Sequence, residues 1–186
     1  DAYSDPGEFV STKNKYKRTV LELENGNAFL MGEGYTKEGQ FPFVDQINLR
    51  SGQKERLYQS NYENKLETLV DGVDMSKGQV LVRIESATDY PNYYLRNIKK
   101  KSSLKAITQF ENPFKAMQEV EKQVITYKRD DGVELNGTLY LPLGYDKEKK
   151  EKMPMIMWAY PVEYKDKSSA GQNTSNPNEF IYPYWG

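Results

Sequence analysis

The sequence predicts a mainly β fold in two parts, and three observations support this prediction. The chain holds 15 Tyr and 7 Phe, and aromatic-rich composition suits many short strands better than long helices. Three strand-sized segments recur in the same order at a spacing of about 50 residues. After about residue 120 the pattern changes to two strand-like runs followed by a longer apolar run.

The recurrence in the first part consists of three pairs of strand-like segments separated by turn-forming residues. The pairs are 27–36 with 78–87, 42–52 with 92–102, and 54–60 with 104–110. A further strand-like segment, Glu67–Met75, is expected to close the first unit before the second begins. Four antiparallel strands in roughly 40–50 residues are typical of a β-propeller blade. Residues 1–119 are therefore expected to form about two blades, the C-terminal part of a propeller domain; the alternative is two ordinary β-meanders of similar length.

The expected domain boundary lies near residue 120. Asn112-Pro113 is a turn signal, and Phe114, Met117 and Val120 follow at a spacing compatible with a short amphipathic helix. Such a stretch between two strand-rich regions is typical of a linker with one or two helical turns.

The second part, residues 120–186, begins with two expected strands, Val124–Tyr127 and Val133–Leu141, joined at the hairpin signal Asp131-Gly132. A charged connection leads to Met153–Ala159, an apolar run that is expected to be a buried strand. Two antiparallel strands, a charged loop and a buried strand are how an α/β-hydrolase sheet begins. This region is therefore expected to be the N-terminal part of an α/β-hydrolase domain.

Charge and composition exclude several function classes. The chain has 26 basic and 27 acidic residues, so it has no electrostatic footprint for nucleic acid. No stretch approaches the roughly 20 apolar residues that a membrane-spanning helix requires, so no membrane insertion is expected. The basic run Lys99–Lys101 is interpreted as a solvated turn, and Asp71, Asp74 and Asp130-Asp131 as turn residues rather than a metal site.

Cysteine and histidine are both absent. This removes disulfides, the commonest metal ligand and the commonest general base. No cofactor or metal is expected, and a Ser-His-Asp triad cannot be completed within these residues. The first ten residues have neither a charged n-region nor an apolar h-region, so we expect no signal peptide there and a start inside a longer protein.

Several segments of the sequence resemble one peptidase family. "ITYKRDDGVELNGTLYLPLGYD", "MPMIMWAYPVEYKDKSSAGQ" and "SNPNEF" resemble the start of the catalytic domain in the prolyl oligopeptidase family of serine peptidases, in particular its glutamyl-endopeptidase-like branch, known from chloroplast and bacterial members. "GEGYTKEGQFPFVDQINLRSGQKERLYQS" resembles the propeller segment upstream, and the resemblance covers most of Phe29 to Phe180. It implies a propeller cap over an α/β-hydrolase domain, a peptide or protein substrate, an acyl-enzyme, cleavage after Glu, and, from bacterial members, a periplasmic or secreted location.

The resemblance also implies a role for Tyr160, which stands where the turn after the apolar run begins. Its hydroxyl would donate to the oxyanion, beside a backbone N–H that follows the nucleophile. The turn reads Tyr160-Pro161-Val162-Glu163-Tyr164 instead of the commoner Tyr-Gly-Gly, so Tyr164 is an alternative donor, and a buried tyrosine packing at a strand end is the structural alternative. Glu163 and Asp166 are interpreted as solvent-exposed loop charges.

The sequence contains no candidate for the nucleophilic serine that the resemblance implies. The sequence has no G-x-S-x-G motif, and Ser168-Ser169-Ala170-Gly171 is expected to be a loop without a nucleophile elbow. The Ser, Asp and His of the triad are thus expected beyond Gly186, or to have been removed, and these residues alone are expected to be inactive.

Three functional hypotheses follow. The first is a fragment of a serine peptidase. The second is a non-catalytic β-rich binding module that self-associates through exposed sheet edges. The third is an esterase-type α/β-hydrolase with a propeller cap. Labelling of a serine separates the enzymes from the binding module, and turnover of peptides against esters separates the first hypothesis from the third.

Overall fold

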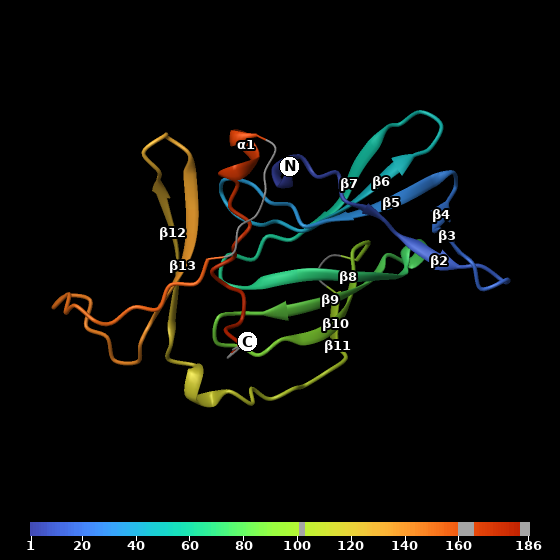
Figure 1. The fold of residues 1–186 in the computed structure, drawn as a ribbon. Helices are drawn as coiled ribbons and strands as arrows, with labels where there is room; N and C mark the ends of the chain where they lie inside the picture. Colours follow the sequence, from blue (N-terminus) through green and yellow to red (C-terminus); the bar gives the residue numbers. More distant parts are fainter. Residues whose placement is uncertain (101–102, 160–165, 183–186) are drawn as a thin grey trace.

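The computed structural model describes residues 1–100, 103–159 and 166–182. It is mainly β, as the sequence predicts, with two multi-stranded antiparallel sheets and a separate hairpin, β12–β13, beside the ends of the two sheets (Figure 1). None of the helices in the described part is longer than four residues. The architecture is consistent with part of a propeller-like region.

The first sheet contains the first set of recurring strands. Its main path runs in the order β1, β5, β6, β7, and β4 also pairs with β5. The bounds are Glu8–Phe9 for β1, Leu23–Glu24 for β4, Asn27–Gly32 for β5, Phe43–Asn48 for β6 and Lys54–Gln59 for β7. Asn25 and Gly26 join β4 to β5 with positive φ at both residues, the conformation that a tight Asn-Gly hairpin turn requires.

The second sheet follows the chain order, with each strand antiparallel to the next. Its strands are β8 (Leu66–Asp74), β9 (Gln79–Glu85), β10 (Asn92–Asn97) and β11 (Ser103–Ala106). The strands β5, β6 and β7 thus correspond to β9, β10 and β11. The recurrence that the sequence predicts is present as paired strands.

The prediction that Glu67–Met75 closes the first unit is wrong. This segment is β8, and it pairs with β9 in the second sheet. The reason lies in its connection: Asp74 accepts a hydrogen bond from the backbone N–H of Lys77, and Gly78 takes a left-handed conformation with φ of 70°. This short turn folds β8 back onto the next strand, because strands joined by short connections become neighbours. The strand β1 takes the corresponding place in the first sheet.

The two sheets pack face to face around one hydrophobic core. Phe29 on β5 and Val44 on β6 lie in the same cluster as Val80 and Val82 on β9, and all four are fully buried. Because these side chains come from both sheets, burial of their apolar surface stabilises the packing of one sheet on the other.

An ion pair is buried beside this core. The Nε of Arg96 on β10 donates to the Glu67 carboxylate on β8, and the side chains are only 8% and 0% exposed. The hydroxyl of Tyr58 on β7 donates to the other carboxylate oxygen of Glu67. Arg96 also donates to the Tyr62 hydroxyl at 3.1 Å. The cluster therefore links the first sheet to the second through bonded polar groups.

Smaller elements lie outside the two sheets. Every residue of the hairpin strands β2 (Ser11–Lys13) and β3 (Thr19–Leu21) is exposed. A one-turn 3-10 helix, Lys115–Met117, lies where the sequence predicts a linker with one or two helical turns, and its N-cap residue makes no side-chain hydrogen bond. Without a side-chain cap or a longer run, a single turn does not extend into an α-helix.

The second part of the chain contains β12 (Glu121–Lys128) and β13 (Glu134–Leu141), which form a two-stranded antiparallel sheet. Gly132 has a positive φ of 83° in the turn between them, so the predicted strands and hairpin signal are confirmed. A further element is α1 (Lys167–Ala170). Nothing in the structure tests the proposed boundary between residues 119 and 120.

The prediction of a buried strand at Met153–Ala159 is wrong. Residues 153–159 form no strand, and Ile156, Met157 and Trp158 are 91%, 81% and 88% exposed. A strand is buried on both faces only where other strands and covering elements flank it. The nearest strands along the described chain form a hairpin of two, which supplies neither a neighbouring strand at this position nor a covering layer.

Candidate functional site

The residue that the sequence singles out as an oxyanion donor, Tyr160, lies outside the described residues. So do Glu163 and Tyr164. The described chain resumes at Asp166, and the oxyanion role of Tyr160 stays a prediction.

Asp166 and the two serines that follow it form a helix cap. The Asp166 carboxylate accepts hydrogen bonds from the hydroxyls of Ser168 and Ser169 and from the Ser169 backbone N–H at 2.8 Å. The Ser168 hydroxyl and the Ser169 N–H lower the pKa of Asp166 to about 2. A carboxylate of such low basicity does not remove a serine proton at neutral pH. The arrangement caps α1, so the prediction of a loop at Ser168-Ser169-Ala170-Gly171 is wrong for its first three residues, which belong to this short helix.

The segment after α1, residues 172–182, crosses the ends of both sheets. The side-chain amide of Asn176 donates to Gln40 in the loop between β5 and β6 at 3.0 Å. The amide of Asn178 donates to the carbonyl of Glu63, just before β8, at 3.1 Å. These bonds hold the end of the described chain against both sheets, and we call residues 172–182 the crossing segment.

Aromatic packing fixes the far end of the crossing segment. Phe180 and Ile181 are buried. The Phe180 ring contacts the Tyr90 ring edge-on, with centroids 5.3 Å apart, and the Tyr182 ring at 5.1 Å. Edge-to-face pairs add about 1 kcal/mol each to the burial of the rings. The crossing segment is therefore anchored at both a polar and an aromatic contact.

A cavity of about 350 Å³ lies where the crossing segment meets the two sheets. Its wall combines residues of three regions: the loop after β5, the paired strands β8 and β9, and the crossing segment. The polar residues that matter for its chemistry are Glu33, Tyr35, Thr68, Arg83, Asn176 and Glu179. We call it the junction cavity.

Two ion pairs lie at the junction cavity. Nη2 of Arg83 is 3.2 Å from Oε1 of Glu85, whose side chain is fully buried. Nζ of Lys122 on β12 is 3.3 Å from Oε2 of Glu179, and the Lys122 side chain is 4% exposed. The second pair joins the β12–β13 hairpin to the crossing segment. The junction cavity therefore lies where the two sheets and the crossing segment meet, next to the contact with the β12–β13 hairpin.

Burial and charge shift two pKa values in this region. Burial raises the pKa of Glu85 in spite of the neighbouring Arg83. Burial, together with the carboxylates of Glu33 and Glu179, raises the pKa of the Tyr35 hydroxyl. Clusters of perturbed groups in a cavity are candidates for function, because the same burial and charge that shift a pKa also act on a ligand.

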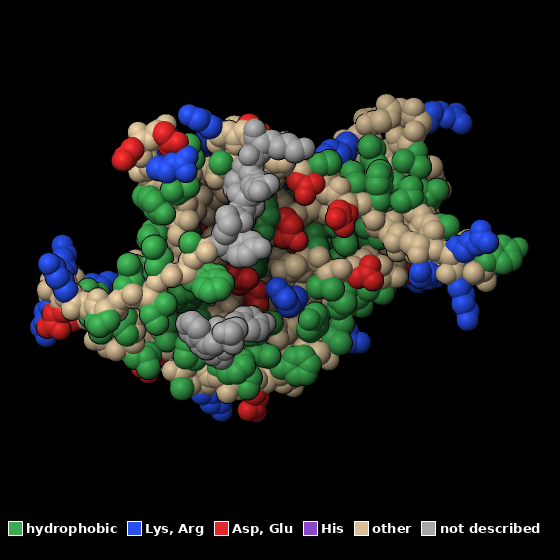
Figure 2. All heavy atoms as spheres, in the orientation of Figure 1, with side chains coloured by type: hydrophobic (Ala, Val, Ile, Leu, Met, Phe, Trp, Pro, Cys, Tyr) green, Lys and Arg blue, Asp and Glu red, His purple; other side chains and the backbone are tan. Residues whose placement is uncertain are grey.

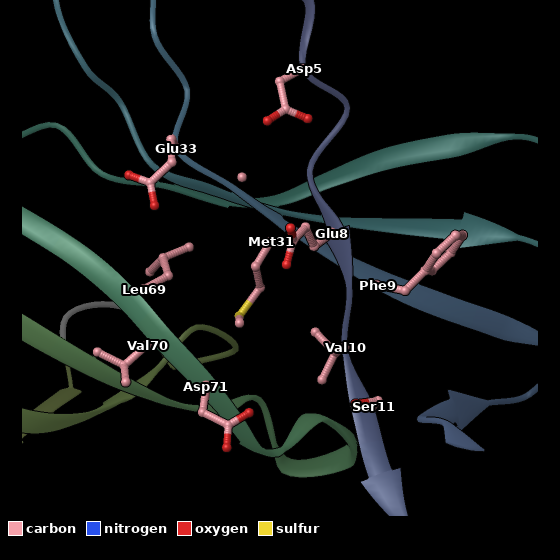
Figure 3. Close-up of a pocket in the computed structure, with 11 residues that line it drawn as sticks. Asp5, Glu8, Phe9, Val10, Ser11, Met31, Glu33, Leu69, Val70 and Asp71 are labelled. Atoms are coloured by element: carbon pink, nitrogen blue, oxygen red, sulfur yellow. The ribbon is translucent and has the colours of Figure 1, made fainter. Parts of the chain in front are cut away.

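A second cavity, of about 360 Å³, lies between β1, β5 and β8. Its lining combines apolar side chains with the exposed acidic residues Asp5, Glu8, Glu33 and Asp71, which come from different elements (Figure 3). Among the residues that the structure describes, no three acidic side chains converge as metal ligands would. Acidic side chains also gather in the hollowed middle of the face in Figure 2.

The sequence analysis did not identify Arg83, Glu85 or Glu179 as members of a site. Arg83 and Glu85 are separated by one residue on a strand, so period-two alternation places them on one face. That alternation was the available signal. Glu179 lies near this face of the strand although it is about 95 residues away in the sequence, and no local sequence pattern predicts that proximity. In the described part of the chain, no helix is long and apolar enough to cross a membrane.

Two curated proteins are similar to nearly all of this chain. A probable chloroplastic glutamyl endopeptidase of Oryza sativa subsp. japonica is 38% identical over 193 residues, covering 97% of this chain and 20% of that protein. A protein of the same name from Arabidopsis thaliana is 35% identical over 194 residues, with 97% and 20% covered.

The chain therefore spans about a fifth of the length of these relatives. No family model matches the chain, and no solved structure does. The two similarities relate the chain to proteins named as peptidases.

Proposed function

We propose that this chain is part of a serine-type peptidase of the prolyl oligopeptidase family, in its glutamyl-endopeptidase-like branch. The observation that carries the proposal is similarity of 38% and 35% identity along 97% of the chain to two probable glutamyl endopeptidases. The two sheets, followed by a hairpin and a segment that returns to them, support it as the end of a propeller and the start of a hydrolase domain.

In this proposal the chain supplies the connection between the propeller cap, which admits the substrate, and the catalytic domain, and the triad comes from further polypeptide. The absence of histidine supports this division, since a Ser-His-Asp triad needs an imidazole to take the serine proton. The apolar run that includes Ile156 and Trp158 is exposed, and in this proposal further polypeptide of the catalytic domain covers it.

Tyr160 is the residue of this chain that we propose to contact the reacting atoms. Its phenolic O–H would donate to the oxygen that becomes negative when the serine attacks the scissile carbonyl. Loss of one such donor lowers kcat by about 10²–10³-fold. The serine oxygen forms an ester bond to the acyl carbon as the C–N bond breaks and the amine product departs with a proton, and a water then hydrolyses this acyl-enzyme to release the acid and free the serine.

The test begins with the polypeptide that carries this sequence, purified from its source. We expect a fluorophosphonate probe to label one serine outside these 186 residues. Peptides with an internal Glu should be cleaved, and Tyr160→Phe should lower kcat with KM little changed. Absence of labelling and of turnover would contradict the peptidase proposal and favour a binding module. Turnover of esters but not of peptides would favour the esterase alternative.

A further inference from the structure

We propose that Asn25 is a site of spontaneous covalent modification, at which the backbone nitrogen of Gly26 attacks the side-chain amide carbon of Asn25 and ammonia leaves. The proposal goes beyond the peptidase function and does not depend on it. It rests on a comparison within the molecule, because the sequence contains the dipeptide Asn-Gly at residues 25–26 and again at residues 136–137. The structure holds these two dipeptides in different ways.

The reaction requires no partner other than water. The Gly26 nitrogen loses its proton to solvent and forms a bond to Cγ of Asn25, the bond from Cγ to Nδ2 breaks, and ammonia departs with a proton. Water then opens the five-membered imide at either carbonyl carbon, which leaves aspartate or isoaspartate. Glycine favours the first step, because it has no Cβ to hinder the approach and its backbone adopts many conformations.

The first dipeptide lies in an exposed turn. Asn25 and Gly26 connect β4 to β5, have φ of 52° and 79°, and are both exposed. Within the described ranges, neither the Asn25 side-chain amide nor the Gly26 N–H is hydrogen-bonded to another group of the protein. A Cβ placed on Gly26 would meet open space. Solvent therefore reaches both reacting groups.

The turn must open before the ring can close, since the five-membered ring fixes ψ of Asn25 outside the range of a tight hairpin turn. This opening is local. The strand β4 has only two residues, which pair as Leu23 with Ala28 and Glu24 with Asn27. Leu23 is 54% exposed, so its release uncovers little apolar surface. Short, exposed elements of this kind open at a low cost in free energy.

The second dipeptide is held inside a longer hairpin. Asn136 and Gly137 lie in β13, which pairs with β12 along all eight of its residues. The Asn136 side chain is bonded at both ends: Oδ1 accepts from the Thr126 hydroxyl at 2.9 Å, and Nδ2 donates to the Gly171 carbonyl at 3.4 Å. Ring closure at Asn136 would break these bonds and the strand pairing around them. The same dipeptide should therefore react far more slowly here.

The product would change the edge of the first sheet. Deamidation places a new carboxylate next to Glu24, whose own carboxylate lies 3.2 Å from Nζ of Lys99, after β10 in the second sheet. An isoaspartate also lengthens the main chain at the turn by one carbon, so the two residues lose the geometry of an Asn-Gly hairpin turn. The pairing of β4 with β5 should weaken as a result.

The test compares the two sites in the polypeptide that carries this sequence. The purified protein is kept at mildly alkaline pH and digested at low pH, and mass spectrometry follows the peptides, since deamidation adds about one dalton. Synthetic peptides of residues 21–30 and 132–141 give the rates of the same dipeptides without a fold. We expect Asn25 to react within about tenfold of its peptide and Asn136 at least about a hundredfold more slowly than its peptide.

Variants test the role of the attacking nitrogen. Gly26→Ala adds a methyl group beside this nitrogen and should slow the conversion of Asn25 at least about tenfold. Gly52→Ala is the matched control, because Gly52 also has a positive φ and open space around it, but lies in another turn. It should leave the conversion of Asn25 unchanged. If Gly26→Ala destabilises the protein, the same replacement in the synthetic peptide measures the steric effect alone.

Three outcomes would overturn the proposal. They are an Asn25 that stays intact while its peptide is converted, an Asn136 that reacts as fast relative to its peptide as Asn25 does, and a rate at Asn25 that is the same in the Gly26 and Gly52 variants. None of these results depends on turnover, so the peptidase proposal stands or falls separately.

Discussion

Replacement of Arg96 by Met tests whether the buried ion pair within the second sheet stabilises the fold. Arg96 and Glu67 are 8% and 0% exposed, and the pair joins β8 to β10. Arg96→Met removes the cation but leaves a side chain of comparable length over the Tyr58 ring, whose centroid lies 5.1 Å from the guanidinium carbon. The Glu67 carboxylate would then be buried with one remaining donor, the Tyr58 hydroxyl.

The expected cost follows from that geometry. Loss of one partner of a buried pair typically costs about 3–5 kcal/mol, because the other charge stays desolvated and uncompensated. The Tyr58 hydrogen bond retains part of the stabilisation, so we expect about 3 kcal/mol. With a urea m value of about 2 kcal/mol/M, the unfolding midpoint would fall by about 1.5 M.

The assay is urea unfolding followed by circular dichroism, with a matched exposed pair as control. Lys149→Met removes the cation of the Lys149–Asp146 pair, whose side chains are 68% and 46% exposed. Exposed pairs are worth less than about 1 kcal/mol, so this variant should unfold almost like the parent. If Arg96→Met lost no more stability than Lys149→Met, the buried pair would not stabilise the fold and the reasoning would be refuted.

Three further predictions address the junction and the parts of the fold around it. Glu85 binds its proton more tightly in the folded chain than in the unfolded chain. The stability that it contributes is therefore complete below its ordinary pKa of 4.5 and is lost as pH rises through the raised value. Glu85→Gln should flatten the plot of unfolding free energy against pH between pH ~4 and ~7, and equal slopes for the variant and the parent would contradict this. Gly34 and Gly52 both have positive φ, but a Cβ at Gly34 would collide with a backbone carbonyl, whereas one at Gly52 would meet open space. Gly34→Ala should therefore lower the free energy of unfolding in urea by at least about 1 kcal/mol more than Gly52→Ala does. Equal losses of stability would refute the steric argument. Trp158 is 88% exposed. In a Trp185→Phe variant of this chain, its fluorescence should show the emission of a water-exposed indole and full quenching by acrylamide, whereas in the larger peptidase of the proposed function it should be protected. Protection from quenching in the 186-residue chain would contradict the exposure of this run.

The strands of the two sheets could be predicted because their signals are local. The recurring strand-like segments and the turn residues between them located the first residues of β5, β6, β9 and β10 to within one position, although the predicted segments extend past the last residues of the strands. The assignment of Glu67–Met75 to the first unit failed, because membership of a sheet depends on which neighbour a strand folds back onto. The tight turn capped by Asp74 decided that, and its residues, Asp74 to Gly78, carry the signal in the sequence.

The expected strand at Met153–Ala159 failed for a different reason. Apolar composition predicts that a segment needs burial, but it does not supply the elements that bury it. Met155 and Trp158 have apolar side chains that are exposed to solvent, so the composition of this segment does not match its environment. Such a disagreement is expected where a segment pairs with polypeptide outside the 186 residues, as the proposed function requires.

The buried ion pair could not have been predicted from local pattern. Glu67 and Arg96 lie 29 positions apart, and a charged residue on a strand is normally read as solvent-facing. Only the formation of the second sheet brings them together, beside Tyr58 and Tyr62. The same holds for the junction cavity, where Arg83 and Glu179 meet through the return of the chain after α1.

The junction cavity and the buried ion pair together divide the fold into parts of different rigidity. The cluster around the ion pair joins the sheets through the Tyr58 hydroxyl, which donates to the fully buried Glu67 carboxylate, so separation of the sheets leaves a buried charge without that donor. The hairpin is joined to the crossing segment through Lys122 and Glu179, of which Glu179 is 56% exposed, and such a contact is screened by water and salt. Relative movement therefore costs less free energy at the junction than between the sheets. Hydrogen exchange should be faster at the amides of the crossing segment than at those of β9, and equal protection of the two would contradict this reasoning.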